Sequence, residues 1–151
     1  MAKSQLRRLS RPLDSADELI ASLNEAAAAS PRAAAIVASA LIEDTLRWCL
    51  CGFLIPKDAQ AELSNEDHAA VFDDESAPLR TFHAKIIMGY GLGIYGKITR
   101  DNLKRIKNIR NIFAHSARII TFDTPEIAKE CREFRYHFFA ESDGSYPITE
   151  R

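Results

Sequence analysis

Helix-start signals recur along this chain and divide it into helical segments. Ser15 stands three residues before Glu18, which is the spacing of a capping box: the serine accepts from the Glu18 amide and the glutamate reaches back. The pairs at 30–31 (Ser-Pro) and 124–125 (Thr-Pro) place a capping side chain before a proline, which is favoured at the first helical position. Each signal is followed by a stretch long enough for a helix. The expected helices cover 15–29, 31 to about 55, and 125 to about 139.

Two further segments have the period of amphipathic helices. Apolar residues recur every three or four positions in the segments 78–91 and 99–116, and Thr99 is the expected N-cap of the second. The expected stripes are Leu79, Phe82, Ile86, Ile87 and Tyr90 in the first segment, and Leu103, Ile106, Ile109 and Phe113 in the second. Residues 58–76 carry seven acids and predict a partly helical connection, whereas 119–122 is a short β-prone piece. The sequence therefore predicts an all-α fold, a helical bundle of about five helices.

The length of 151 residues fits one domain that can bury a core without disulfides or metals. We expect a basic N-terminal arm over 1–13, the bundle over 14–139, and a loosely held tail over 140–151. The longest apolar run, Trp48 to Ile55, is far shorter than the roughly 18 residues typical of a membrane span. No apolar region follows the basic arm, so a signal peptide is not expected and the predicted location is the cytoplasm. The net charge of −1 gives no global attraction to nucleic acid or membrane.

The glycines at 91, 93 and 96 have the G-x-G-x-x-G spacing of dinucleotide-binding folds. That site needs a preceding strand, a helix opening at the last glycine, and an acid about 20 residues on. Here the preceding segment is helical by its period, and the residue 20 beyond Gly91 is Asn111. We therefore expect these glycines to end a helix with left-handed conformations and close packing, and we expect no cofactor.

Metal binding is not expected either. Cys49 and Cys51 stand two apart within an expected helix, so their side chains point to nearly opposite faces and cannot chelate one ion. With Cys131 they make an odd count, which predicts buried or half-buried thiols in a reducing compartment.

The segment RNIFAHS, 110–116, is the one candidate for chemistry. Arg110 offers a fixed cation for a phosphate, and His115 titrates near neutrality, so the pair could cleave RNA without a metal. At 100° per residue, a basic stripe that ends in an amide and an imidazole forms one polar face of this helix. The stripe comprises Arg100, Lys104, Lys107, Asn111 and His115, and its first three members are the RNA-binding candidates.

The spacing of this motif poses a geometric problem. Arg110 and His115 are five residues apart and so lie about 140° apart around a regular helix. Either the helix loosens at Ala114, or the site is composite and two chains lay these helices together. The alternative is structural: Arg110 pairs with Glu43 or Asp44, and His115 caps the helix C-terminus, where a cation is favoured. Glu43 is also four residues before Arg47, the spacing of a solvated ion pair.

The block 77–116 (APLRTFHAKIIMGYGLGIYGKITRDNLKRIKNIRNIFAHS), with TFDTPEI at 121–127, resembles the central block of the mannitol operon repressor family. The resemblance covers about residues 33–130, and its specific parts are Pro78-Leu79, the turn at 90–93 and the end from Arg110 to His115. The family more usually has Gly-Pro-Leu-Gly where this chain has Ala-Pro-Leu-Arg at 77–80.

That family is similar to the wider HEPN superfamily of helical bundles, in which an Arg, polar residue and His motif marks metal-independent endoribonucleases that work as dimers. The resemblance implies Arg110, Asn111 and His115 as the motif, and a site formed between two protomers. It also implies that such domains can bind partners without cleaving RNA.

Two functions follow as expectations. The first is a regulatory, non-enzymatic dimeric bundle that acts through contacts with a protein partner. The second is a metal-independent endoribonuclease with Arg110 and His115 at the dimer interface. No helix-turn-helix with a basic recognition helix is present in the sequence, so direct sequence-specific DNA binding is not expected.

Overall fold

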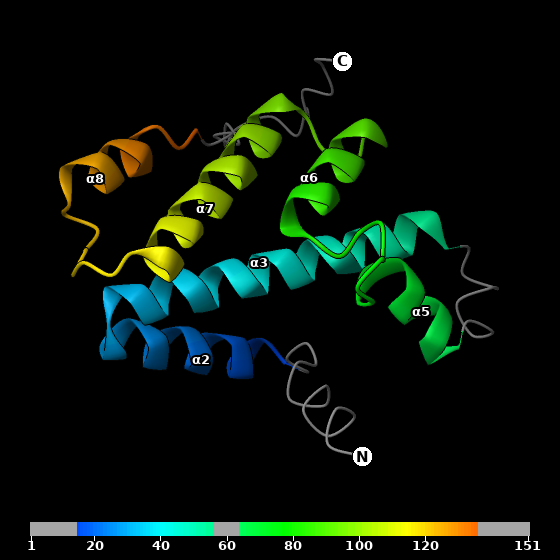
Figure 1. Cartoon of the computed structure of the whole chain (residues 1–151), viewed down its shortest axis with the longest axis horizontal. Helices are drawn as coiled ribbons and strands as arrows, with labels where there is room; N and C mark the ends of the chain where they lie inside the picture. Colours follow the sequence, from blue (N-terminus) through cyan, green and yellow to red (C-terminus); the bar gives the residue numbers. More distant parts are fainter. Residues whose placement is uncertain (1–14, 56–63, 136–151) are drawn as a thin grey trace, which may run out of the picture.

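A computed structural model describes residues 15–55 and 64–135, and within these ranges the chain is all-helical (Figure 1). The predicted all-α bundle is confirmed. The boundaries at 13–14 and 139–140 lie outside the described residues. The described helices are α2 (Ala16–Ala29), α3 (Pro31–Leu54), α5 (Asn65–Phe72), α6 (Phe82–Gly91), α7 (Lys97–His115) and α8 (Pro125–Arg132).

Side-chain caps set most of the helix starts. The Oγ atoms of Ser15 and Ser30 accept from the amides three residues on, at 3.2 and 3.0 Å, as predicted from local sequence. The α5 helix opens with a capping box between Ser64 and Asp67. The α6 helix begins later than the predicted position 78, because Thr81 caps it by accepting from the Ala84 amide at 3.1 Å.

Three further expectations from the sequence are wrong. The α7 helix begins at Lys97, after Gly96, so Thr99 lies inside its first turn and is not the N-cap. The α8 helix begins at Pro125 as predicted but ends at Arg132, well before 139. The β-prone piece 119–122 forms no strand; the Thr121 amide donates to Thr124 Oγ1 at 3.0 Å in a turn before α8.

The long helix α3 is the centre of the packing, because α2, α6 and α7 all contact it (Figure 1). One apolar cluster joins the second half of α3 to α5, α6 and α7, and another joins its first half to α7 and α8. Each fully buried side chain of this kind contributes about 1.5–3 kcal/mol. The first cluster comprises Leu46, Leu50, Phe72, Leu79, Phe82, Ile86 and Leu103. The second comprises Ala35, Ile109, Phe113 and Ile127.

The turn between α6 and α7 explains the glycine motif. Gly93 has a φ of 71°, a left-handed conformation that side chains with a Cβ resist. Gly89 lies under Tyr95: a Cβ at position 89 would stand 2.7 Å from Tyr95 Cε1, while the Tyr95 hydroxyl donates to the Ile86 carbonyl at 2.7 Å. These glycines therefore allow the tight turn and the close packing of the hairpin formed by α6 and α7.

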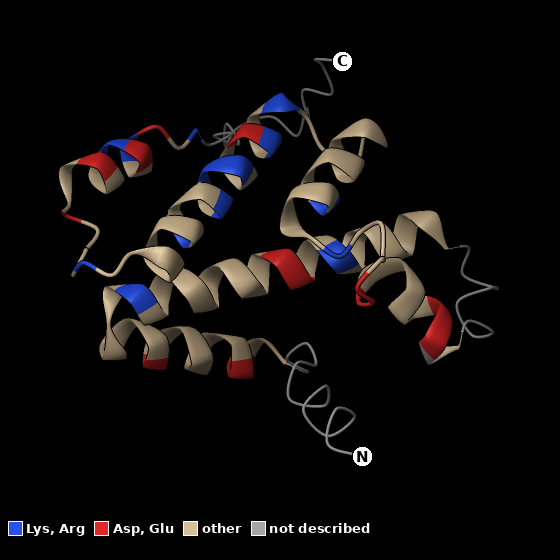
Figure 2. Ribbon diagram, in the orientation of Figure 1, with Lys and Arg blue, Asp and Glu red and all other residues tan. Residues whose placement is uncertain are grey.

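Charged side chains concentrate on particular helices (Figure 2). Six Lys or Arg residues and one acid lie along α7, whereas α5 carries two acids and no Lys or Arg. Arg47 of α3 holds the end of α5 through a bidentate ion pair with Asp73, both distances being 2.8 Å. The expected pair between Glu43 and Arg47 is therefore not formed, because each has a partner on another element.

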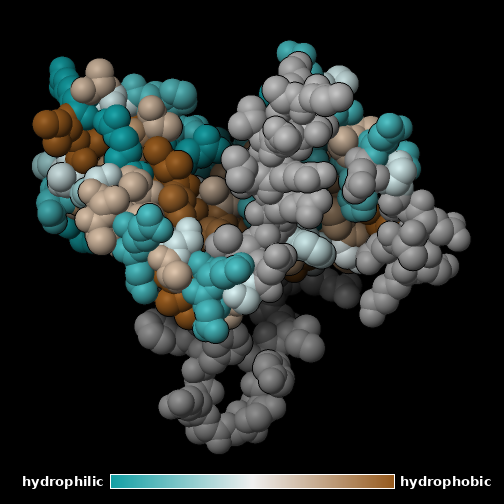
Figure 3. Space-filling model, turned by 90° about the horizontal axis from the view of Figure 1, so that it is seen from below, coloured by the Kyte–Doolittle hydropathy of each residue, from teal (hydrophilic) through white to brown (hydrophobic). Residues whose placement is uncertain are grey.

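Several large apolar side chains stay exposed on the described surface. Seen from below in Figure 3, hydrophobic residues reach the surface among hydrophilic ones. Among them, Ile36 lies on α3, Ile112 on α7, and Ile119 and Phe122 between α7 and α8. Within the described ranges, no helix has the length and apolarity needed to cross a membrane.

Candidate functional site

A carboxylate on α3 lies between two cations from neighbouring helices. Lys85 Nζ of α6 is 2.7 Å from Glu43 Oε1, and Arg110 Nη2 of α7 is 3.6 Å from Glu43 Oε2. The Lys85 ammonium also donates to the Arg80 carbonyl at 3.1 Å. Glu43 is therefore the one point at which charges from α3, α6 and α7 meet among the described residues.

Burial makes this cluster matter for folding. The side chain of Lys85 is only 6 % exposed and that of Glu43 21 %, whereas Arg110 keeps 32 % of its side chain in solvent. An ammonium at this depth is stable only while an opposite charge and hydrogen bonds compensate it. Arg110 contributes less because its distance is longer and its exposure higher. The structural alternative for Arg110, a pair with Glu43, is thus observed.

Asp44, the neighbour of Glu43, has a different role. Its pKa lies above the usual range for a carboxyl, chiefly because burial disfavours the charged form, and Arg47 opposes that effect. No described ion pair joins Asp44 to Arg110. The predicted alternative partner of Arg110, Asp44, therefore does not form that ion pair.

His115 is the last residue of α7 and is exposed. The helix runs unbroken to His115, so the expectation that it loosens at Ala114 is wrong. Within one chain, Arg110 and His115 stay about 140° apart around the axis. Asn111 lies between them on α7 and is half-buried. His115 is the basic residue of the last turn of α7, which is the position that the capping alternative expects.

The end of α7 is held from a distance in sequence. Arg32, at the start of α3, donates through Nη2 to the carbonyls of Ser116 and Arg118 at 2.8 and 3.2 Å. These bonds satisfy acceptors just beyond the last turn of the helix, where carbonyls lack intrahelical partners. The contact fixes the turn that carries His115 against α3.

The RNA-binding candidates on α7 differ in their availability. Arg100 stacks over the Tyr90 ring, with Cζ 4.2 Å from the centroid, and pairs with Asp101 at 3.0 Å. Lys104 and Lys107 are half-buried and make no ion pair with any residue that the structure describes. The first member of the predicted polar stripe, Arg100, is therefore already engaged within the chain.

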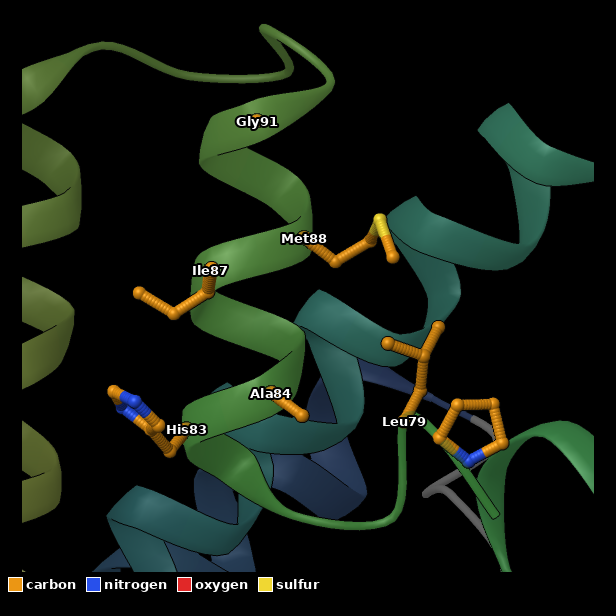
Figure 4. A pocket seen from close by; sticks show the side chains of 7 residues that line it. Leu79, His83, Ala84, Ile87, Met88 and Gly91 are labelled. Carbon is orange, nitrogen blue, oxygen red and sulfur yellow. The ribbon is translucent and has the colours of Figure 1, made fainter.

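An apolar hollow of about 500 Å³ runs along the outer side of α6 (Figure 4). We call it the α6 hollow; it is lined by Pro78, Leu79, His83, Ala84, Ile87, Met88 and Gly91. His83 and Ile87 point toward α7, and Met88 points to the opposite side (Figure 4). Sequence reasoning missed this surface because it placed Ile87 and Tyr90 in one apolar stripe with residues that are buried, whereas both are exposed. The run Ile86-Ile87-Met88 is wider than one apolar stripe and was the available signal.

No group of three or more His, Cys, Asp or Glu within the described ranges is arranged to hold a metal ion. The three cysteines are free thiols, and Cys49 is exposed, so the expectation that all three are at least half-buried is wrong for that residue. Burial raises the pKa of the Cys51 thiol.

Comparisons with protein-family models, with curated proteins and with solved structures find no match to this chain. The resemblance of the block around Arg110 and His115 is therefore carried by the motifs alone.

Proposed function

We propose that this chain is a regulatory, non-enzymatic helical bundle that acts as a dimer through protein contacts, similar to the mannitol operon repressor family. One observation carries the preference over catalysis. Glu43 pairs with Arg110 on the side of α7 that faces α3, whereas the side chain of His115 projects about 140° away around the helix axis. A phosphate bound by Arg110 would have to displace that carboxylate, and it would still lack the histidine.

The surface near the end of α7 supports contacts with a protein. Ile119 is 98 % exposed, and Ile112, Ile36 and Phe122 are exposed as well. Large exposed apolar side chains are common at protein–protein interaction sites. Regulation as the outcome of such contacts rests on the resemblance of the sequence motifs to those of the repressor family.

A metal-independent endoribonuclease is the second candidate. The exposure of His115 favours this function. Lys104 and Lys107 favour it as well, because they belong to the same predicted stripe of α7 and make no ion pair with described residues. In this function, His115 acts as acid or base toward the ribose and Arg110 holds the phosphate, with the two residues coming from different protomers. Turnover then requires that two α7 helices meet and that Arg110 leaves Glu43.

Mapping of transcript 5′ ends separates the two functions. Cells that lack the gene would be compared with cells that carry the parent chain or the variant His115→Gln. A regulator changes the abundance of a restricted set of transcripts at their existing 5′ ends, and the variant retains this effect. New internal 5′ ends that depend on His115 would overturn the proposal.

Purified protein gives the matching direct test. We expect no cleavage of a mixed RNA substrate in EDTA. Cleavage by the parent that falls about 10²–10⁴-fold in His115→Ala, with both proteins folded, would establish the nuclease instead.

A further inference from the structure

Three zones of different chemistry lie next to one another around α6. The α7 helix, which packs against α6, carries the lysines 104 and 107. The α6 helix carries a single charge, Lys85, which is buried, so its outer side is apolar. On the other side, α5 and the turn after it are acidic (Figure 2). The order of the zones is therefore basic, apolar, acidic.

The middle zone has the features of an uncovered contact surface. Ile87, Met88 and Tyr90 are 45 %, 38 % and 38 % exposed on a helix of ten residues. Ala84 has a small side chain and Gly91 has none; both line the hollow, so another backbone can approach closely there. Large side chains on both sides of such a track favour the packing of a second helix into the groove.

The outer zones carry charges that the described structure does not neutralise. Lys104 and Lys107 make no ion pair with described residues, and the same holds for the side chains of Glu66 and Glu75. Acids with a structural task are different: the Asp67 carboxylate accepts from the Ser64 amide in the capping box of α5, and Asp73 pairs with Arg47. The basic zone and the acidic zone therefore each keep charges available for a partner.

We propose that a second copy of this chain covers the α6 hollow about a two-fold axis, so that α7 of each copy faces α5 of the other. A two-fold axis that runs parallel to α6 places the two α6 helices side by side and parallel, and each basic zone then meets an acidic zone. The inference rests on the dimer of the proposed function and names its interface.

The charge order favours a second copy over other occupants. A nucleic acid would gain from Lys104 and Lys107 but would be repelled by the acids on the far side of α6. A surface that runs from basic through apolar to acidic is complementary in charge to a second copy of itself that is rotated by 180° about an axis along α6. Because α7 meets α5 in this arrangement, the two α7 helices do not meet, and a composite site of Arg110 and His115 is not formed.

A charge-swap experiment tests this interface. One variant carries Lys104→Glu and Lys107→Glu, and the other carries Glu66→Lys and Glu75→Lys. Each variant alone juxtaposes like charges across the axis, whereas a mixture restores opposite charges at both contacts. Sedimentation velocity would measure the mass of the parent, of each variant and of the 1:1 mixture, with circular dichroism confirming that each is folded.

We expect a dimeric parent, a dimer weakened at least about tenfold in either variant, and recovery in the mixture as a heterodimer. The parent dimer should also weaken as salt is raised, because exposed charges are screened. An additional variant, Ala84→Arg, should give a folded monomer that mixing with either charge variant does not rescue.

Three results would overturn the inference in distinguishable ways. A dimer that neither charge variant weakens places the interface elsewhere and leaves the proposed function standing. A mixture that stays monomeric rejects the α7-to-α5 pairing. A monomeric parent rejects self-association and with it the dimer of the proposed function, but it leaves regulation through contacts with a different protein, which the transcript experiment tests independently.

Discussion

Removing the charge of Glu43 should destabilise the fold although the side chain keeps its shape. The variant Glu43→Gln leaves the ammonium of Lys85, 6 % exposed, without its counter-charge. Breaking one partner of a buried pair costs about 3–5 kcal/mol. The glutamine oxygen can still accept from Lys85, and position 43 is one-fifth exposed, so we expect about 2–3 kcal/mol.

Urea unfolding followed by circular dichroism measures this loss directly, and we expect the melting temperature to fall by roughly 6–10 °C in parallel. The double variant Glu43→Gln with Lys85→Met should recover most of the stability, because the uncompensated charge is then gone. Glu25→Gln on exposed α2 is the matched control and should stay within about 0.5 kcal/mol of the parent. A Glu43→Gln protein as stable as this control would refute the argument.

Three further results are expected. Gly89→Ala should lose about 1–3 kcal/mol in thermal unfolding, because its Cβ would stand 2.7 Å from Tyr95. Asp44→Asn should raise stability at pH 7. The folded pKa of this carboxyl is above its ordinary value of 3.8, so the carboxylate form opposes folding above the folded pKa and the gain should vanish below about pH 4. Cys49, which is exposed, should react with a thiol reagent faster than Cys51, whose pKa is raised by burial.

Controls make these results decisive. Trimming the ring with Tyr95→Leu should restore part of the stability lost in Gly89→Ala, and a failure to do so would reject the steric argument. A pH-independent gain in Asp44→Asn would show that titration is not the cause. Equal reaction rates of Cys49 and Cys51, measured by mass spectrometry of labelled peptides, would contradict the assigned burial.

Local signals were sufficient for part of the fold. Ser15 and Ser30 cap helices where the sequence placed them, because a cap depends only on residues three positions away. The start of α7 could not be read in this way. Its first turn has no side-chain cap and follows directly from the hairpin turn, in which the Ile94 amide donates to the Gly89 carbonyl at 3.0 Å.

In the candidate site, too, some features could be predicted from the sequence and others depend on how the helices pack. The pairing of Arg110 with Glu43 was one of the alternatives open from the sequence, since both are charged residues on long helices. The burial of Lys85 could not be predicted from the sequence, because it depends on the packing of α6 against α3, which no local pattern encodes. The exposed side of α6 was missed for a related reason: a wide apolar face does not indicate which of its edges another helix covers.

The contact made by Arg32 has a consequence for how the chain opens. This one guanidinium joins the first turn of α3 to carbonyls 84 and 86 positions later. We therefore expect the end of α7 and the beginning of α3 to open as one cooperative unit in native-state hydrogen exchange. Fraying of the turn that follows His115 requires that the Arg32 hydrogen bonds to this turn break. Amides at the start of α3 and at the end of α7 should therefore lose protection together.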